Sequence, residues 1–252
     1  MTARPKLIFI GTGEAFDEEL PNTSILYDSG ETRLLMDCGY SVPQQVWRQS
    51  GDPEFLQGIF ISHHHADHAF GIPAVLTRMW ETKRSTPLTL LGHEGTQVYI
   101  RNLMEMAYPT LLSRLGFPLE FMEVRAGDQV PFRELQLAFA QSVHSVTNYS
   151  LRISQGGKTI CYSGDGSFSD ATRELFRGCD VLIHESFAWE RRVPSHASLK
   201  EVLEMAGAQN VKKYCLVHLQ RDFKKKVGDL LRDLPQMSLN LLVPKPGEEM
   251  YV

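Results

Sequence analysis

The sequence predicts an α/β fold: an αββα sandwich of two mixed β-sheets with helices on the outer faces. Strand-like runs dominate early in the chain and again in its middle, and segments with helical periodicity follow each group. That order favours two sheets packed face to face with helices outside. The 252 residues can bury a large core, and no linker or short repeat divides them, so we expect a single domain over residues 1–252.

Charge and cysteine content narrow the class of protein. The formal net charge is −4, whereas a domain that holds long nucleic acid by phosphate contacts is usually basic. The four scattered cysteines include no Cys-x-x-Cys pair and are typical of buried thiols in a reducing compartment. The apolar run near the N-terminus is too short for a signal peptide, and no later run reaches the length of a membrane span. We therefore expect a cytoplasmic protein that does not bind a membrane.

The first predicted strand, residues 6–10, runs into Gly11-Thr12-Gly13-Glu14, where two glycines permit positive φ and close backbone approach. No third glycine or helix follows at the spacing of a dinucleotide-binding motif. Two more strands are predicted at residues 24–28 and 32–37, with a hairpin turn at residues 28–31.

The later elements follow from periodicity and from turn residues. Helices are predicted at residues 41–51, 70–83, 94–108, 169–176, 198–206 and 223–234. Strands are predicted at residues 58–62, 87–91, 119–124, 135–141, 149–154, 159–163, 181–184, 214–217 and 239–243. Residues 126–129 are predicted as a turn, and residues 155–158 as a hairpin turn.

An apolar strand at residues 59–61 leads into Ser-His-His-His-Ala-Asp-His at residues 62–68. Imidazole nitrogens and carboxylate oxygens are the usual ligands of borderline divalent metals, and one ion cannot use so many. We therefore expect two metal ions, which lie about 3.5–4 Å apart in such centres. His63 and His65 should share one side, while Asp67 and His68 face a second position. An artificial tag would lie at a terminus and carry no interleaved aspartate.

The pattern His-x-His-x-Asp-His resembles the signature of the metallo-β-lactamase superfamily, which has the αββα fold. Polar residues that end or closely follow three later predicted strands, each of which alone could be a cap or a turn residue, match its remaining ligand positions: His144, Asp165 and His218. The resemblance implies that one metal ion is held by His63, His65 and His144. It implies that the other is held by Asp67, His68 and His218, and that Asp165 bridges the two.

The same resemblance implies a hydrolase, because two cations that share a water lower its pKa until it can attack a substrate near neutral pH. Zinc is the first choice of metal because the ligands are rich in nitrogen, with manganese or iron as alternatives. The di-iron oxidoreductase branch has a glutamate where this chain has His65, which also favours hydrolysis.

Two further segments resemble the RNase Z-like phosphodiesterases. His184-Glu185-Ser186-Phe187 is similar to their His-Glu-Ala-Thr segment, from which its last two residues depart. Ser195-His196-Ala197-Ser198 is similar to their His-Ser-Thr segment. The resemblance implies that His196 stabilises the charge on the phosphorus or protonates the leaving oxygen, and that Glu185 orients it. The predicted catalytic residues are thus Asp67, His196 and Glu185, although His196 could instead cap the following helix.

The tRNA-processing members of this branch carry a long arm between the positions that match His144 and Asp165. Here these residues are 21 apart, which leaves room only for a hairpin. We therefore expect a phosphodiesterase acting on an RNA 3′ end, an oligonucleotide or a cyclic nucleotide, without a grip on the body of a tRNA. Alternatives are an acyl, thioester or lactone hydrolase on the same metals, or a non-catalytic scaffold subunit. The scaffold is disfavoured because all seven ligand positions are filled.

Other residues receive simpler predictions. Asp37 ends an apolar strand, and the resemblance implies that it hydrogen-bonds the ligand loop and orients it. His64 should pack against the scaffold, His184 should be structural, and His93 should be a turn residue far from any motif. Lysines at positions 212–213 and 224–226 should form a solvated face. Apolar residues at positions 99–115 offer a surface for a homodimer.

Overall fold

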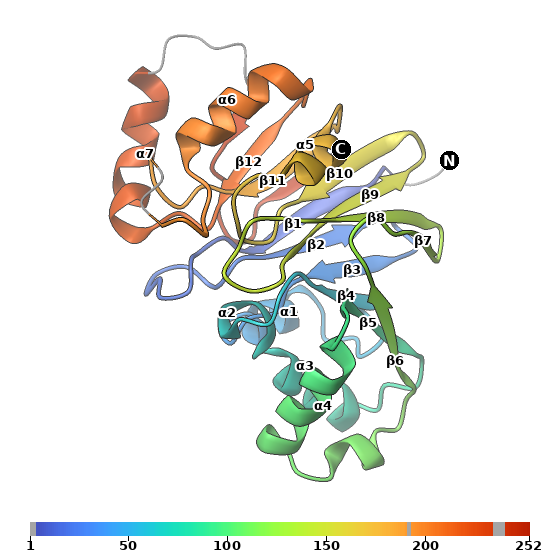
Figure 1. Cartoon of the computed structure of the whole chain (residues 1–252). Coiled ribbons are helices and arrows are strands. Elements are labelled where there is room, and N and C mark those ends of the chain that lie inside the picture. The colour runs from blue at the N-terminus through green and yellow to red at the C-terminus, as the bar shows by residue number, and fades with distance from the viewer. Residues whose placement is uncertain (1–3, 191–192, 234–239) are drawn as a thin grey trace.

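The computed structural model of the chain describes residues 4–190, 193–233 and 240–252. Within these residues, two seven-stranded sheets lie face to face (Figure 1). The first sheet has the strand order β14-β1-β2-β3-β4-β5-β6, and the second has the order β13-β12-β11-β10-β9-β8-β7. The predicted αββα sandwich is therefore confirmed.

The bounds of the elements agree with the sequence prediction to within a few residues for most of the chain. The strands of the first sheet are β1 (Lys6–Gly11), β2 (Ser24–Asp28), β3 (Arg33–Met36), β4 (Gly58–Ile61), β5 (Leu88–His93), β6 (Leu119–Val124) and β14 (Glu249–Tyr251). Those of the second are β7 (Gln129–Phe132), β8 (Leu135–Gln141), β9 (Tyr149–Gln155), β10 (Lys158–Tyr162), β11 (Val181–Glu185), β12 (Tyr214–Val217) and β13 (Leu241–Leu242). The helices are α1 (Pro43–Gln49), α2 (Ala66–Ala69), α3 (Ile72–Glu81), α4 (Thr96–Ala107), the 3-10 helix η1 (Leu111–Arg114), α5 (Asp170–Phe176), α6 (Leu199–Gln209) and α7 (Arg221–Asp233).

Four of the described elements were not predicted: α2, β7, β14 and η1. The β7 strand has only four residues and contains Pro131, which is rare inside strands, so its short alternation of exposed and buried residues was not recognised. The β14 strand has three residues and is held by pairing with β1. The predicted ends at residues 234 and 239 lie outside the described residues.

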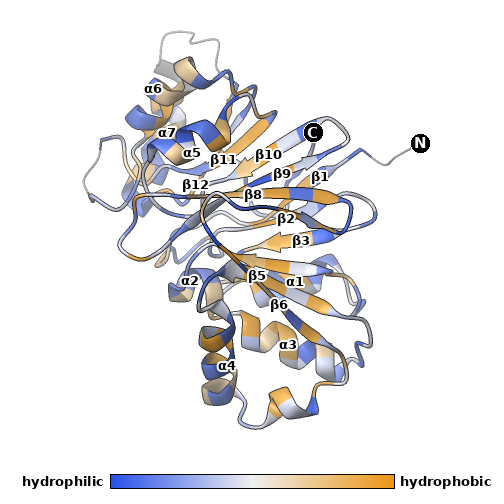
Figure 2. Ribbon diagram, turned by 45° about the vertical axis from the view of Figure 1, so that its right-hand side comes forward, coloured by the Kyte–Doolittle hydropathy of each residue, from blue (hydrophilic) through white to orange (hydrophobic). Residues whose placement is uncertain are grey.

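The core has three layers that follow from the alternation of each strand. In β1, Leu7 and Phe9 face the second sheet, whereas Ile8 and Ile10 face the helices on the outer side. Helices α1, α3 and α4 cover the outer face of the first sheet, and α5, α6 and α7 cover that of the second. Figure 2 shows the hydrophobic residues of the strands between these helices.

Close backbone packing at two glycines places the short helix α2 against the end of β3. A Cβ on Gly39 would collide with the carbonyl oxygen of Asp67, and a Cβ on Gly71 would collide with the carbonyl oxygen of Gly39. Cys38 N–H also donates to His68 O at 2.7 Å. Glycine is therefore required here for the loop after β3 to approach the histidine-rich segment.

Among the described residues, none of the helices combines the length and the apolar composition needed to cross a bilayer.

Helix α4 offers a matched test of its packing. Met104 is fully buried, whereas Met106, two residues further along, is 75% exposed. Met104→Ala should lower the free energy of unfolding by about 2–5 kcal/mol because it leaves a cavity in the outer core. Met106→Ala should change it by less than about 0.5 kcal/mol. Urea denaturation of both variants measures the difference, and equal effects would contradict the placement of α4.

Candidate metal centre

The residues predicted as metal ligands come together at one edge of the sandwich, beyond the carboxyl ends of four strands. His63 and His65 follow β4, and His144 follows β8. Asp165 follows β10, and His218 follows β12. Parallel strands such as β10, β11 and β12 all end at the same edge, so residues far apart in the sequence meet there.

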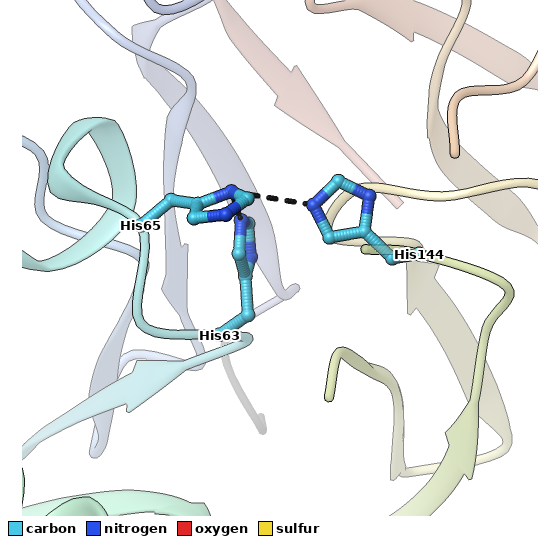
Figure 3. A group of neighbouring side chains, drawn as sticks. All are labelled: His63, His65 and His144. Carbon is cyan, nitrogen blue, oxygen red and sulfur yellow. Dashed lines mark hydrogen bonds between the residues drawn. The ribbon is translucent and has the colours of Figure 1, made fainter. Parts of the chain in front are cut away.

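The first cluster consists of His63, His65 and His144 (Figure 3). His65 Nδ1 lies 3.0 Å from His63 Nε2 and 3.3 Å from His144 Nε2. If the outward Nδ1 atoms of His63 and His144 carry the protons, two Nε2 lone pairs face His65 Nδ1, which can donate to only one of them. A cation between them would give every lone pair a partner.

The outward nitrogens of two of these rings are held by the protein. His63 Nδ1 lies 3.0 Å from Ser62 Oγ. His144 Nδ1 donates to the carbonyl oxygen of Ser195 at 2.7 Å. Each contact fixes the ring so that its other nitrogen faces the cluster, as partners of metal-bound histidines generally do.

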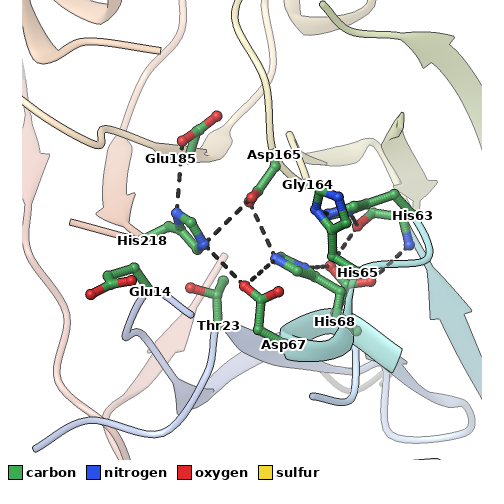
Figure 4. A network of polar contacts seen from close by, with 12 residues as sticks. Glu14, Thr23, His63, His65, Asp67, His68, Gly164, Asp165, Glu185 and His218 are labelled. Atoms are coloured by element: carbon green, nitrogen blue, oxygen red, sulfur yellow. Dashed lines mark hydrogen bonds and ion pairs between the residues drawn. The ribbon is translucent and has the colours of Figure 1, made fainter. Parts of the chain in front are cut away.

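The second cluster consists of Asp67, His68, Asp165 and His218, all of which are buried (Figure 4). His68 Nε2 lies 3.2 Å from Asp67 Oδ2 and 3.4 Å from Asp165 Oδ1. His218 Nε2 lies 3.4 Å from the carboxylate of each aspartate. Within the described part of the chain, His68 Nε2 and Asp165 Oδ1 are buried without a hydrogen-bond partner. Such orphaned atoms fit a cation site.

Asp165 connects the two clusters. Its carboxylate meets His68 and His218 of the second cluster, and it also groups with His144 of the first. Asp165 therefore occupies the position from which one carboxylate could touch two ions. The structure thus brings together all seven residues that the sequence predicts as ligands, in two groups that could hold metal ions.

Burial and nearby charges shift the pKa values of the histidines in opposite directions in the two clusters. Burial lowers the pKa of His63 well below its usual value, which keeps the ring neutral and its lone pair available. Burial also opposes the charged form of His68 and His218, but the carboxylates around them outweigh it. They raise the pKa of His68 well above its usual value and that of His218 to about 9. The second cluster therefore attracts positive charge.

Asp37 orients the loop that carries these ligands, as predicted. Its carboxylate accepts from the backbone N–H and the hydroxyl of Ser62, both at 2.7 Å. It lies 2.8 Å from His68 Nδ1 and accepts from Tyr162 OH at 2.7 Å. The contact with Nδ1 leaves His68 Nε2 facing the second cluster.

Glu185 and His196 form the predicted pair next to the clusters. His196 Nδ1 lies 2.8 Å from Glu185 Oε2. Glu185 Oε1 also accepts from the backbone N–H groups of Gly166 and Ala197. Burial opposes the charged imidazole, but the bond to Glu185 outweighs it and raises the pKa of His196. With Nδ1 held, Nε2 is the ring nitrogen left for a substrate. His184 is buried against Phe168 and does not join the pair.

A cavity of about 670 Å³ opens over both clusters. His65, Asp67, Asp165, His196 and His218 line it from the metal side. The remaining wall is largely aromatic and apolar. It contains residues that the sequence did not single out for a site: Phe16, Tyr40, Val193, Gln220 and Arg221.

Two of the simpler predictions are wrong. His93 is the last residue of β5 rather than a turn residue, and its ring lies 4.1 Å from the ring of His64 beside the ligand loop. The prediction of a solvated lysine face is correct for Lys212 and Lys225, whose side chains are 70% and 63% exposed, but wrong for Lys224, which is 16% exposed and pairs with Asp17 at 2.7 Å. His64 packs as predicted, with its ring stacked on Tyr99.

Comparisons with known proteins agree with this geometry. A family model described as anti-Pycsar protein Apyc1 matches residues 5–232. Ribonuclease Z of Methanosarcina mazei is 28% identical over 98% of both proteins. That alignment runs over 303 positions, 51 more than the residues of this chain, so the relative carries insertions.

Solved structures share the fold. YhfI from Bacillus subtilis superposes with a TM-score of 0.77 at 22% identity, over 98% of this chain and 99% of that protein. The short form of human tRNase Z gives 0.77 at 17% identity, over 97% and 98%. The predicted RNase Z-like branch of the metallo-β-lactamase superfamily and the predicted metal-dependent hydrolase are confirmed. Because the family model spans most of the sequence, this chain belongs to the family of anti-Pycsar protein Apyc1.

Proposed function

We propose that the chain is a dinuclear metal-dependent phosphodiesterase that cleaves nucleotide-sized phosphodiesters. The observation that carries the proposal is the pair of ligand clusters joined by Asp165 under a cavity that also contains His196. His63, His65 and His144 would hold one ion, and Asp67, His68 and His218 would hold the other. We assign zinc to both positions because most of the ligand atoms are imidazole nitrogens, with manganese and iron as the alternatives that metal analysis distinguishes.

A bound metal pair would acidify a water molecule and neutralise charge on a phosphoryl group. The chain's own residues orient the rest of the reaction. Glu185 holds Nδ1 of His196, so Nε2 can donate a proton to the leaving oxygen of the substrate. The backbone N–H groups of Gly166 and Ala197 fix the Glu185 carboxylate in turn. Glu185 is therefore a positioning residue, and His196 is the residue that would touch the substrate.

The size of the substrate follows from the chain between β8 and α5. Strands β9 and β10 form a tight hairpin through Gly156 and Gly157, both at positive φ. The hairpin lies between His144 and Asp165, the interval in which the tRNA-processing enzymes that the sequence resembles carry their arm. A cavity of about 670 Å³ is of the size that holds a small ligand. We therefore favour cyclic nucleotides and oligonucleotide ends over a folded tRNA, although the curated relatives are named for a ribonuclease.

One observation favours a second candidate, an acyl, thioester or lactone hydrolase. The cavity wall beside His196 contains Phe187 and Val193, which would suit an apolar acyl chain. The same metal clusters would serve that reaction. A panel of substrates separates the two candidates, as described below for His196.

The metal content of the chain tests the ligand assignment. Elemental analysis of the purified wild type should find two ions per chain. His144→Ala should hold fewer, because it removes a ligand from the first cluster. His93→Ala is the matched control: it removes a histidine near the ligand loop that belongs to neither cluster. If the wild type takes up fewer than two ions even when dialysed against zinc or manganese, the assignment is wrong.

Asp37 can be tested through metal affinity. Asp37→Asn replaces one acceptor oxygen with an amide donor opposite Ser62, His68 and Tyr162. The affinity for metal should fall about 10- to 100-fold, as it does when partners of metal-bound histidines are lost. Competition with a chelating dye measures it. Asp52→Asn, at an exposed carboxylate that accepts from the backbone N–H of Glu54, should leave the affinity unchanged.

The role of His196 is tested with a panel of substrates on wild type and His196→Ala. The panel contains bis-(p-nitrophenyl) phosphate, 2′,3′- and 3′,5′-cyclic nucleotides, precursor tRNA and a thioester. His196→Ala should keep both metals and lose about 100-fold or more of its rate on diesters with poor leaving groups. The nitrophenyl ester should be affected less, because its leaving oxygen needs no proton. Unchanged rates on every poor-leaving-group diester would remove His196 from the mechanism, and turnover of the thioester alone would favour the second candidate.

A further inference from the structure

The loop between β1 and β2 carries an aromatic side chain into the mouth of the cavity. Phe16 lines the cavity, yet 73% of its surface is exposed. In Figure 1 this loop projects beside the start of α7. A single exposed phenylalanine is ordinary in a protein surface, so its position alone decides nothing.

Three hydrogen bonds hold the backbone of Ala15 and Phe16. Its N–H donates to Glu14 Oε2 at 2.8 Å, and its carbonyl oxygen accepts from Arg221 Nη1 at 3.0 Å. The carbonyl oxygen of Ala15 accepts from Tyr40 OH. These contacts hold the loop from α7 and from the segment after β3, while they leave the Phe16 ring uncovered.

Two ion pairs hold the loop to α7. Arg221 Nε lies 3.1 Å from Glu14 Oε1. The Lys224 ammonium lies 2.7 Å from Asp17, whose carboxylate is otherwise buried, and 3.1 Å from Glu19. Buried or partly buried pairs order a loop more firmly than exposed ones. The ring of Phe16 is thus presented by a rigid support and not by a loose loop.

Other aromatic rings line or border the same cavity. The Phe187 ring stacks on His196, with centroids 4.8 Å apart and planes 24° apart. His196 in turn stacks on His218 at 5.6 Å and 12°. The cavity lining therefore contains the rings of Phe16 and Phe187 together with residues of both clusters, and Arg221 and Gln220 are also in its wall.

We propose that Phe16 is the stacking surface of a nucleobase subsite, with the phosphodiester of the same substrate at the metal clusters. A nucleobase has two apolar faces and a polar edge, which match a ring wall bordered by Arg221 and Gln220. Stacking on an aromatic side chain tolerates every base because each has a flat face. This inference rests on the proposed phosphodiesterase and adds the part of the substrate that the cavity recognises. Arg221 is the positioning residue, through its bond to the Phe16 carbonyl oxygen.

Equilibrium binding tests the subsite without any turnover. The metal-loaded wild type should bind adenosine 5′-monophosphate and cytidine 5′-monophosphate with an affinity at least about ten times that for ribose 5-phosphate, which lacks the base. Phe16→Ala should abolish that ratio and leave the affinity for ribose 5-phosphate unchanged. Phe16→Trp should preserve the ratio. Tyr251→Ala, at an exposed aromatic residue on β14 that does not line the cavity, is the control and should behave as wild type.

Arg221→Ala tests the positioning role. Arg221→Ala should reduce the ratio of nucleotide affinity to ribose 5-phosphate affinity. The double variant with Phe16→Ala should have the same ratio as Phe16→Ala alone, because both substitutions act through the Phe16 ring. Independent losses would mean that Arg221 contacts the ligand itself and would overturn its positioning role. An unchanged ratio in Phe16→Ala would overturn the subsite even if the wild type hydrolyses nucleotides. If the binding ratios are as expected but the protein hydrolyses no diester, the proposed function is contradicted, while Phe16 is still supported as the residue that binds the base.

Discussion

The buried carboxylate of Asp37 is the constraint on which the geometry of the site depends. The side chain is fully buried and receives hydrogen bonds from Ser62, His68 and Tyr162. A buried carboxylate without such partners would cost several kcal/mol. Because Tyr162 belongs to the second sheet and Ser62 follows a strand of the first, these hydrogen bonds join the two sheets at this edge. Asp37 also has a left-handed backbone, with φ of 62°, which aspartate tolerates better than most residues.

The polar atoms at this edge fall into two sets with opposite surroundings. The outward-facing nitrogens of His63, His68 and His144 have partners, which are Ser62, Asp37 and the Ser195 carbonyl oxygen. Inward-facing atoms such as His68 Nε2 and Asp165 Oδ1 are buried and lack hydrogen-bond partners within the described residues. The protein therefore orients the rings of His63, His68 and His144 by itself, and a cation would give the unpaired inward-facing atoms a partner.

Sequence reasoning was strongest where chemistry is local and weakest where contact depends on register or on distant segments. The histidine-rich run indicated a metal site by itself, whereas His144, Asp165 and His218 were predicted as ligands because the resemblance to the superfamily singled them out among the polar residues that follow strands. The position of His93 was predicted wrongly because it depends on strand pairing. Gly92 of β5 is paired with Ile61 of β4, so His93 lies beside the loop that follows β4, where its ring contacts that of His64. The bond between Arg221 and Phe16 joins residues 205 apart and leaves no trace in any local pattern. Strand β7 was not predicted because it has only four residues and one of them is Pro131, which is typical of a loop.

Different parts of this chain form the two clusters and the rest of the cavity wall. The ligands sit at the ends of buried strands, where a shift of one residue would turn a side chain away from the clusters. The loops that border the cavity carry no such restriction, because their lengths can change without moving a strand. The hairpin at Gly156 and Gly157 is short, and the loop that carries Phe16 is held by α7 instead of by the sheets. The two histidine and aspartate clusters are thus fixed by the strands, whereas the cavity wall that would contact a substrate is built largely by loops.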